Sequence, residues 1–282
     1  LYYTTVKLGT PAKVFHVQVD TGSDLFWVSC GTCKKCPKYS QLGVVNFFAP
    51  ESSSTAFSLG CSQSFCHHKH LGIATTCLKG NQCGYTSNYA DIIDSSGFFV
   101  SDLMIFDLVY ENDTAVICST NITFGCTISL TGLPTLQGQA DGIIGLGHSE
   151  VSILSQLASS EEIPKIFSHC LMGEGFGGGV LLFGEILETD LIYTPLVSSR
   201  SHYGVDVEGI EINGQVLPID PKVFKSSRYR GAIFDSGSTF VSLIDDAYVP
   251  FARNVKSALS HLVPVSDLEG DLCYESSTRV SF

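Results

Sequence analysis

Two stretches of nearly identical sequence constrain the fold of this chain more than any other feature. Asp20-Thr21-Gly22-Ser23 and Asp235-Ser236-Gly237-Ser238 each begin with Asp and continue with a hydroxyl residue, Gly and Ser. Each follows a short apolar run that is typical of a β-strand, Phe15–Val19 before the first and Ala232–Phe234 before the second. The chain is therefore expected to use one strand-and-turn motif twice.

Asp20 and Asp235 are the candidate catalytic residues. Two carboxyl groups held about 3 Å apart cannot both ionise, so one of them keeps a proton. The ionised group can act as general base on a shared water molecule. The protonated group can polarise the carbonyl of a peptide bond and later protonate the leaving amine. Because the proton belongs to the pair, neither Asp is assigned a fixed role.

The residues around each Asp favour a tight turn in which the carboxyl group is held in place. Gly22 and Gly237 allow close backbone approach and unusual backbone angles. Hydroxyl groups can hydrogen-bond the carboxylates or the opposite turn and hold the two carboxyl groups coplanar. These hydroxyl groups belong to Thr21, Ser23, Ser236 and Ser238. One such stretch alone is more often an ordinary turn, but two copies after apolar runs favour the catalytic interpretation.

Together with other segments, these motifs resemble the pepsin-like aspartic proteases, the standard example of such a carboxyl pair. The resemblance extends over nearly all of the chain. It covers four segments. Asp20–Val28 resembles the family's first catalytic loop, and Ala232–Thr239 resembles the second. Asp141–Gly147 resembles the apolar-apolar-Gly segment behind the first Asp, and Tyr2–Pro11 resembles the opening strand. The cysteine-rich insertion after Trp27 and the segment Phe167–Leu171 resemble the plant nepenthesin-type branch.

The resemblance implies an all-β, bilobal fold with a few short helices. It predicts an N-terminal lobe, 1–188, with Asp20, the flap and the cysteine-rich insertion, and a C-terminal lobe, 189–282, with Asp235. With 282 residues, of which 44% are hydrophobic, the chain has enough apolar material for two cores. No second apolar-apolar-Gly segment follows Asp235. The second lobe is therefore expected to be partial, and the chain alone poorly active.

Local patterns agree with a β-rich fold. Asn213-Gly214, at the centre of 204–219, is the strongest short signal for a hairpin. Two helices are expected, one capped by Ser149 and one that begins at Asp245 or Asp246. The apolar positions of the first are Val151, Leu154 and Leu157, and those of the second are Tyr248, Phe251, Ala252, Val255 and Leu259.

The resemblance also implies which residues contact a substrate. A hairpin flap should close over the peptide with a Tyr near its tip; Tyr89 matches this position, and Tyr85 is the competing candidate, although both could be ordinary strand aromatics. Trp27 matches the residue whose indole N–H bonds the flap Tyr, and Ala90 stands where the family often has Gly. The expected substrate-binding residues are Tyr89, Gly22, Gly237 and Ser238, and the supporting residues are Thr21, Ser23, Trp27 and Ser236.

The chain has eleven cysteines, which suits an oxidising compartment better than the cytosol. Cys30–Cys36 and Cys61–Cys66 could also be interpreted as a zinc site, but their spacing forms no clean pair of CxxC motifs. The resemblance implies the disulfides Cys30–Cys33, Cys36–Cys126, Cys61–Cys83 and Cys66–Cys77. The number is odd, and the candidates for cysteines without a partner are Cys170 and Cys273. Two sequons, at Asn112 and Asn121, are compatible with N-glycosylation.

Composition limits the partners of the protein. The formal net charge is −12 and there is no basic patch, which argues against nucleic acid binding. No run approaches the roughly 18 apolar residues of a membrane span. We expect peptide or protein substrates, no metal or other cofactor, a monomer, and a location that is secreted, in the apoplast, or vacuolar within the endomembrane system.

The sequence therefore predicts an aspartic endopeptidase with an acidic pH optimum and a preference for apolar side chains next to the scissile bond. Two alternatives stay open. The same plant fold also serves as a non-catalytic binding or inhibitor protein that has lost a catalytic Asp, but both Asp residues are retained here. A zinc-binding interaction protein is the other.

Overall fold

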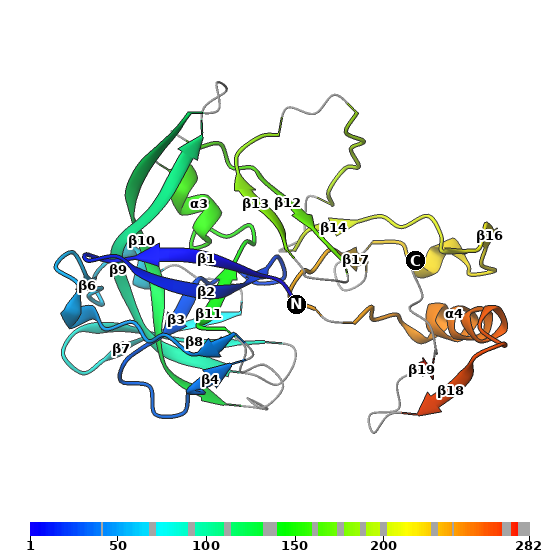
Figure 1. Ribbon diagram of the computed structural model, residues 1–282, viewed down its shortest axis with the longest axis horizontal. Coiled ribbons are helices and arrows are strands. Elements are labelled where there is room, and N and C mark those ends of the chain that lie inside the picture. Colours follow the sequence, from blue (N-terminus) through cyan, green and yellow to red (C-terminus); the bar gives the residue numbers. More distant parts are fainter. Residues whose placement is uncertain are drawn as a thin grey trace. The chain divides into compact units, whose positions relative to one another are not determined.

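The computed structural model describes most of the chain, with gaps (Figure 1). The described residues are 1–40, 42–67, 72–89, 94–109, 114–131, 140–159, 163–173, 178–186, 190–197, 202–226, 231–238, 240–266 and 272–275. Two compact units are present. The first comprises Leu1–Tyr193, Ser201–Tyr203 and Phe234–Thr239, and the second comprises Thr194–Arg200, Gly204–Ile233 and Phe240–Phe282. The expected division into 1–188 and 189–282 stays a prediction.

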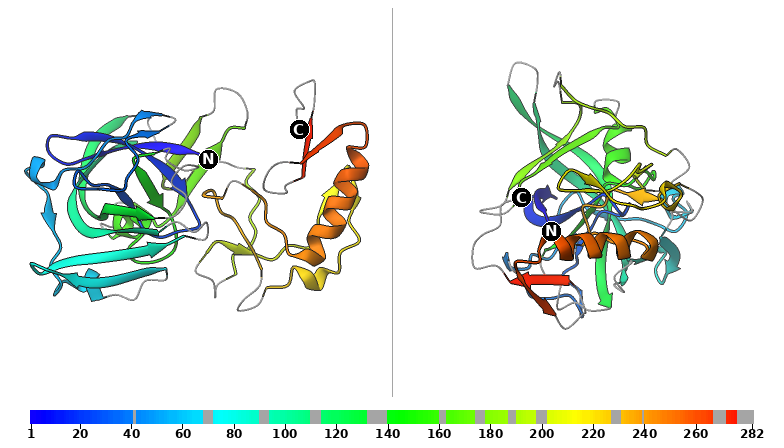
Figure 2. Two further views of the ribbon diagram at one scale, coloured as in Figure 1. Left: turned by 90° about the horizontal axis from the view of Figure 1, so that it is seen from below. Right: turned by 90° about the vertical axis from the view of Figure 1, so that its right-hand side faces the viewer.

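The first unit is built on one large, strongly curved sheet (Figures 1 and 2). Its strands, in spatial order, are β1 (Tyr3–Leu8), β2 (Lys13–Asp20), β11 (Gly142–Gly145), β3 (Trp27–Ser29), β10 (Ala115–Thr131), β9 (Asp94–Val109), β8 (Gln82–Asn88) and β7 (Ile73–Leu78), and β6 (Phe57–Ser58) pairs with β9. Because β1 pairs with β9 as well as with β2, the strands from β1 to β9 form a closed ring. Strands predominate in the described residues, which confirms the all-β class.

Every second side chain of β2 points into the ring of strands and helps to fill its interior. Phe15, Val17 and Val19 are buried and lie in the main hydrophobic core, with residues from β1, β3, β9, β10 and β11. β11 is inserted between β2 and β3, parallel to the first and antiparallel to the second. A side chain on Gly142 would lie 1.9 Å from the carbonyl oxygen of Trp27, so only glycine fits where these strands meet.

Shorter elements complete the first unit. They are β4 (Tyr39–Ser40), β5 (Gly43–Val44), the 3₁₀ turn η1 (Pro50–Ser52), α1 (Ser64–His67), α3 (Ile153–Ala158), β12 (Phe167–Leu171) and β13 (Gly179–Phe183). The expected cap of α3 was wrong by one turn. Ser152, not Ser149, is the N-cap, because its hydroxyl accepts the Ser155 N–H, while the Ser149 carbonyl accepts the Ser155 hydroxyl.

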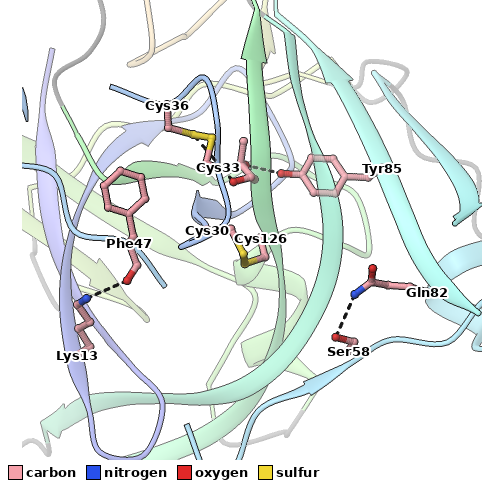
Figure 3. The surroundings of a disulfide bond; sticks show 10 residues. Lys13, Cys30, Cys33, Cys36, Phe47, Ser58, Gln82, Tyr85 and Cys126 are labelled. Carbon is pink, nitrogen blue, oxygen red and sulfur yellow. Dashed lines mark hydrogen bonds between the residues drawn. A yellow bond between two sulfur atoms is a disulfide. The ribbon is translucent and has the colours of Figure 1, made fainter. Parts of the chain in front are cut away.

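The four predicted disulfide pairings are wrong, although they use the right eight cysteines. The bonds are Cys30–Cys126, Cys33–Cys36, Cys61–Cys77 and Cys66–Cys83. Cys30 directly follows β3, whose neighbour β10 places Cys126 beside it in the core, whereas Cys33 and Cys36 close a surface turn of their own (Figure 3). These sulfur atoms are therefore not free to form the zinc site considered above.

Two cysteines of the described residues are unpaired. Cys170, one of the two candidates, is exposed, and Cys118 on β10 is half-buried. The side chain of Cys273, the other candidate, lies outside the described residues.

The second unit contains short strand pairs and one long helix. Its elements are β14 (Gly204–Val205), β15 (Glu211–Ile212), β16 (Gln215–Val216), the 3₁₀ turn η2 (Pro221–Val223), β17 (Ala232–Ile233), α4 (Asp245–Ala258), β18 (Val263–Ser266) and β19 (Leu272–Glu275). The hairpin at Asn213-Gly214 is confirmed: both residues have positive φ, as a two-residue turn between β15 and β16 requires. The start of α4 at Asp245 is also confirmed. Its expected apolar face is only partly correct, since Tyr248 is exposed and the buried residues are Ala247 and Ala252.

Candidate active site

Asp20 is the last residue of β2, and its carboxyl group is held by its own turn. The Gly22 N–H donates a hydrogen bond of 2.8 Å to one carboxyl oxygen. The Ser23 hydroxyl donates to the other. Both oxygens therefore have a donor from the four-residue motif itself, which fixes the plane of the carboxyl group.

Asp235 follows β17 and repeats this arrangement. The Gly237 N–H donates to Asp235 Oδ1 at 2.8 Å, and the Ser238 hydroxyl donates to Oδ2 at 2.8 Å. Both turns belong to the first unit. The two copies of the sequence motif thus make the same hydrogen bonds, because in each a Gly N–H and a Ser hydroxyl donate to the Asp carboxyl group.

The hydroxyl groups of Thr21 and Ser236 interlock the two turns. Each backbone N–H donates to the opposite hydroxyl, from Ser236 to Thr21 at 2.9 Å and from Thr21 to Ser236 at 3.2 Å. Each hydroxyl in turn donates across the pair, Thr21 to the Phe234 carbonyl at 3.1 Å and Ser236 to the Val19 carbonyl at 2.8 Å. These two hydroxyl groups therefore bond the opposite turn and not the carboxylates.

The glycines show how closely the two turns approach. A β-carbon on Gly22 would lie 2.5 Å from the carboxyl group of Asp235, and one on Gly237 would lie 2.3 Å from a carboxyl oxygen of Asp20. Each carboxyl group thus rests against the backbone of the other turn. A methyl group at either position would overlap with a carboxyl group unless the turns moved apart.

Burial makes Asp20 a weaker acid than an exposed Asp. Its side chain is only 6% exposed, and this burial raises its pKa to about 6. The hydrogen bonds from Ser23 and Gly22 act in the opposite direction, while the charge of Asp235 and a hydrogen bond between the two carboxyl groups raise the pKa further. The nearby carboxyl group of Asp235 thus adds to the effect of burial on the pKa of Asp20.

A segment expected from the sequence lies directly behind Asp20. The Leu146 N–H donates to the Asp20 carbonyl at 2.8 Å, and the Gly147 N–H donates to the Ser23 carbonyl at 2.9 Å. Asp141 anchors the start of this segment, because its buried carboxylate accepts the N–H groups of His16 and Asn46. The turn at Asp20 is thus supported by β11 and the residues after it.

The structure separates the two tyrosine candidates for the flap. The Trp27 indole N–H donates to the Tyr89 hydroxyl at 2.7 Å, and burial and the nearby charge of Asp20 raise the pKa of Tyr89 to about 12. Tyr85 is instead a core residue, 2% exposed, whose hydroxyl bonds Thr127 at 2.6 Å. Of the two tyrosines, Tyr89 is therefore the one that is bonded to Trp27 and lies near Asp20. Ala90 is outside the described residues.

Comparison with known proteins places these features in a family. A family model described as "Xylanase inhibitor N-terminal" matches residues 2–185, and one described as "Xylanase inhibitor C-terminal" matches residues 202–281. Aspartic proteinase 36 of Arabidopsis thaliana is 36% identical over 250 residues, which is 88% of this chain and 51% of that protein. The chain belongs to the plant pepsin-like aspartic protease family.

Other members of this family match almost the whole chain. Aspartic proteinase 39 of Arabidopsis thaliana is 32% identical over 99% of the chain and 58% of its own length. Aspartic proteinase nepenthesin-1 of Nepenthes gracilis is 29% identical over 99% of the chain and 61% of its own length. The chain thus spans between about half and three fifths of the length of these relatives.

Two residues near the aspartic protease turns were not expected from the sequence. The Tyr203 hydroxyl donates to the Leu146 carbonyl at 2.5 Å, and the Gln18 side chain donates to the Gly237 carbonyl at 3.4 Å. Gln18 alternates with buried residues on β2, so its outward position was readable from the strand pattern. No local signal identifies Tyr203, because its partner lies far away in the sequence.

Proposed function

We propose that this chain carries the catalytic pair of an aspartic endopeptidase. Asp20 and Asp235 are the proposed catalytic residues, and the observation that carries the proposal is their placement on two interlocked turns with the same hydrogen bonds. A pair of carboxyl groups that shares a proton has both the base and the acid that peptide hydrolysis needs.

The proposed reaction uses one water molecule between the two carboxyl groups. The ionised carboxylate takes a proton from this water while its oxygen attacks the peptide carbonyl carbon, and the protonated carboxyl group donates its hydrogen bond to the carbonyl oxygen. The C–N bond then breaks as the amine nitrogen receives a proton from the pair. One water is consumed, an acid and an amine are released, and the pair regains its single proton.

The substrate is proposed to be an extended peptide with apolar side chains next to the scissile bond. Tyr89 is proposed to cover it from the flap side, held by Trp27, and Gly22, Gly237 and Ser238 are proposed to contact it. Since Asp20 has a raised pKa of about 6, the singly protonated pair is lost as the pH rises through this range. The proposed optimum is therefore acidic.

The test is peptide hydrolysis by the full-length protein, with the substitution Asp20→Asn. We expect a fall in kcat/KM of at least about 10³-fold, because the variant loses the proton-sharing pair. Asp107→Asn is a matched control, since it removes an exposed carboxylate on β9 and should leave kcat/KM unchanged. A wild-type protein that neither cleaves peptides at any pH nor binds pepstatin, a statine peptide that mimics the tetrahedral intermediate, would contradict the proposal.

The non-catalytic binding or inhibitor protein is the less favoured function. Both Asp residues are present, and each accepts the hydrogen bonds that hold it in its turn. The words "Xylanase inhibitor" in the descriptions of the two matching family models refer to other proteins of the family. Failure to bind pepstatin, together with the absence of peptide cleavage, would revive this alternative.

We also propose that the protein is secreted or enters the vacuole. Four disulfides support an oxidising route, since such bonds persist in secretory compartments. Among the described residues, there is no helix with the length and apolar character needed to cross a membrane. A monomer that does not bind nucleic acid stays our expectation.

N-glycosylation at Asn121 is a further part of this proposal. Asn121 is exposed on β10 and pairs with Leu103 of β9, on the face that also carries the exposed Ile117. Asn112 lies outside the described residues. In protein from a eukaryotic secretory host, we expect an amidase-sensitive glycan at Asn121 that is lost in Thr123→Val and retained in Thr123→Ser. An unmodified Asn121 peptide in the secreted wild-type protein would contradict it.

A further inference from the structure

Tyr203 makes one hydrogen bond that connects distant parts of the first unit. Its hydroxyl donates to the carbonyl of Leu146 at 2.5 Å, and its ring lies 4.1 Å from the ring of His148 and 5.6 Å from that of Phe167, measured between centroids. The ring is thus held on two sides while the hydroxyl reaches the segment behind Asp20.

This bond closes a circuit that passes through the first Asp turn and through Phe234, the residue before Asp235. Leu146 donates its N–H to the Asp20 carbonyl at 2.8 Å, and Phe234 donates its N–H to the Tyr203 carbonyl at 3.0 Å. The Thr21 hydroxyl donates to the Phe234 carbonyl at 3.1 Å, and Thr21 is bonded covalently to Asp20. The other links of the circuit are backbone groups and the Thr21 hydroxyl of the Asp20–Ser23 motif. The Tyr203 hydroxyl is therefore the one side-chain link that does not belong to this motif.

We propose that Tyr203 is a positioning residue for the carboxyl pair: its hydroxyl ties the support behind Asp20 to Phe234, the residue before Asp235. This inference rests on the proposed function, in which the spacing of the two carboxyl groups sets their shared proton. A displacement of a few tenths of an ångström at such a site costs activity without unfolding the protein.

The chemistry of the hydroxyl suits a permanent donor. A backbone carbonyl only accepts, so the link requires a protonated phenol. Burial, and then the charge of Asp24, raise the pKa of Tyr203 to about 12. The phenol therefore stays protonated throughout the acidic range in which the pair is proposed to work.

The test is Tyr203→Phe in the full-length protein, which removes one oxygen atom and keeps the ring. We expect kcat to fall about 10-fold with KM within about twofold, because the pair is misplaced and the substrate contacts remain. The upper limb of the pH profile should move to lower pH, because separated carboxyl groups raise the pKa of Asp20 less.

Tyr2→Phe is the matched control, since the Tyr2 hydroxyl also donates to a backbone carbonyl, that of Met172 at 2.8 Å. It should leave the pH profile unchanged. If Tyr203→Phe lowers only the melting temperature, as Tyr2→Phe does, and leaves kcat and the pH profile at wild-type values, the proposal is overturned.

A second measurement separates this proposal from the proposed function. The ¹³C signals of the Asp20 and Asp235 carboxyl groups report their titration whether or not the protein cleaves peptides. An acidic shift of the upper transition in Tyr203→Phe supports the positioning role even for an inactive protein, and identical titration in both proteins refutes it. Absence of peptide cleavage by the wild type would contradict only the proposed function.

Discussion

The turns at Asp20 and Asp235 have the same internal hydrogen bonds but different surroundings. β2, which leads into Asp20, is paired on both sides by β1 and β11, whereas β17, which leads into Asp235, is paired with β14 in the part of the chain that the structure describes. Val19 before Asp20 is 2% exposed, and Phe234 before Asp235 is 63% exposed. The motif therefore determines how each carboxyl group is held, and the surroundings determine how far it is removed from water.

Apart from the carboxyl groups themselves, the largest expected effect comes from the glycines that bring the turns together. Gly22→Ala and Gly237→Ala should each lower kcat/KM by about 100-fold or more, because a methyl group at either position overlaps with a carboxyl group. Steady-state peptide hydrolysis at the optimal pH checks this. Gly43→Ala is the control for activity, since a side chain there meets no atom within 4 Å. Near-wild-type activity of Gly22→Ala would show that the turns are less closely apposed than described.

The difference in burial should appear in the pH dependence of stability. The pKa of Asp20 is raised from 3.8 to about 6, so the folded state binds the proton more tightly than the unfolded state. Its contribution to stability is complete below about pH 4 and is lost as the pH rises through about 6, a loss of about 3 kcal/mol. Asp20→Asn should not show this loss.

Urea unfolding of both proteins at pH 4 and pH 8 measures the effect. The free energy of unfolding of Asp20→Asn, relative to the wild type, should rise by about 3 kcal/mol between the two values. Asp107→Asn, at an exposed position, provides the baseline for removal of a carboxylate. An equal pH dependence in Asp20→Asn and the wild type would mean that Asp20 is not desolvated.

The smallest expected effect concerns the indole hydrogen bond. Trp27→Phe removes the donor to the Tyr89 hydroxyl and keeps an aromatic ring. We expect KM to rise about threefold to fivefold with a small change in kcat, because the loss of one neutral hydrogen bond is worth about 1 kcal/mol. Tyr85→Phe should leave KM unchanged, since Tyr85 bonds the core residue Thr127. A larger KM effect from Tyr85→Phe than from Trp27→Phe would reverse the assignment.

The sequence predicts those features whose physical cause is local. A turn that needs glycine, a hairpin at Asn213-Gly214 and the acidic start of α4 at Asp245 all depend on neighbouring residues, and all three are present. The relation between Tyr89 and Trp27 came from the family resemblance, since the two residues are far apart in the chain.

What the sequence did not predict depends on three-dimensional neighbours. Cysteine spacing does not determine connectivity, and only the pairing of β3 with β10 places Cys126 beside Cys30. Ser149 and Ser152 are both reasonable caps by residue type, and the path of the chain before α3 selects Ser152. Tyr203 carries no motif, because its hydrogen-bond partner is a backbone carbonyl.

The Cys30–Cys126 bond encloses the other three disulfides within one covalent loop. A single backbone cut anywhere between these two cysteines therefore leaves the fragments joined through sulfur. For a protein proposed to be a peptidase, a single cut in this region would therefore not release the part of the chain that carries Asp20.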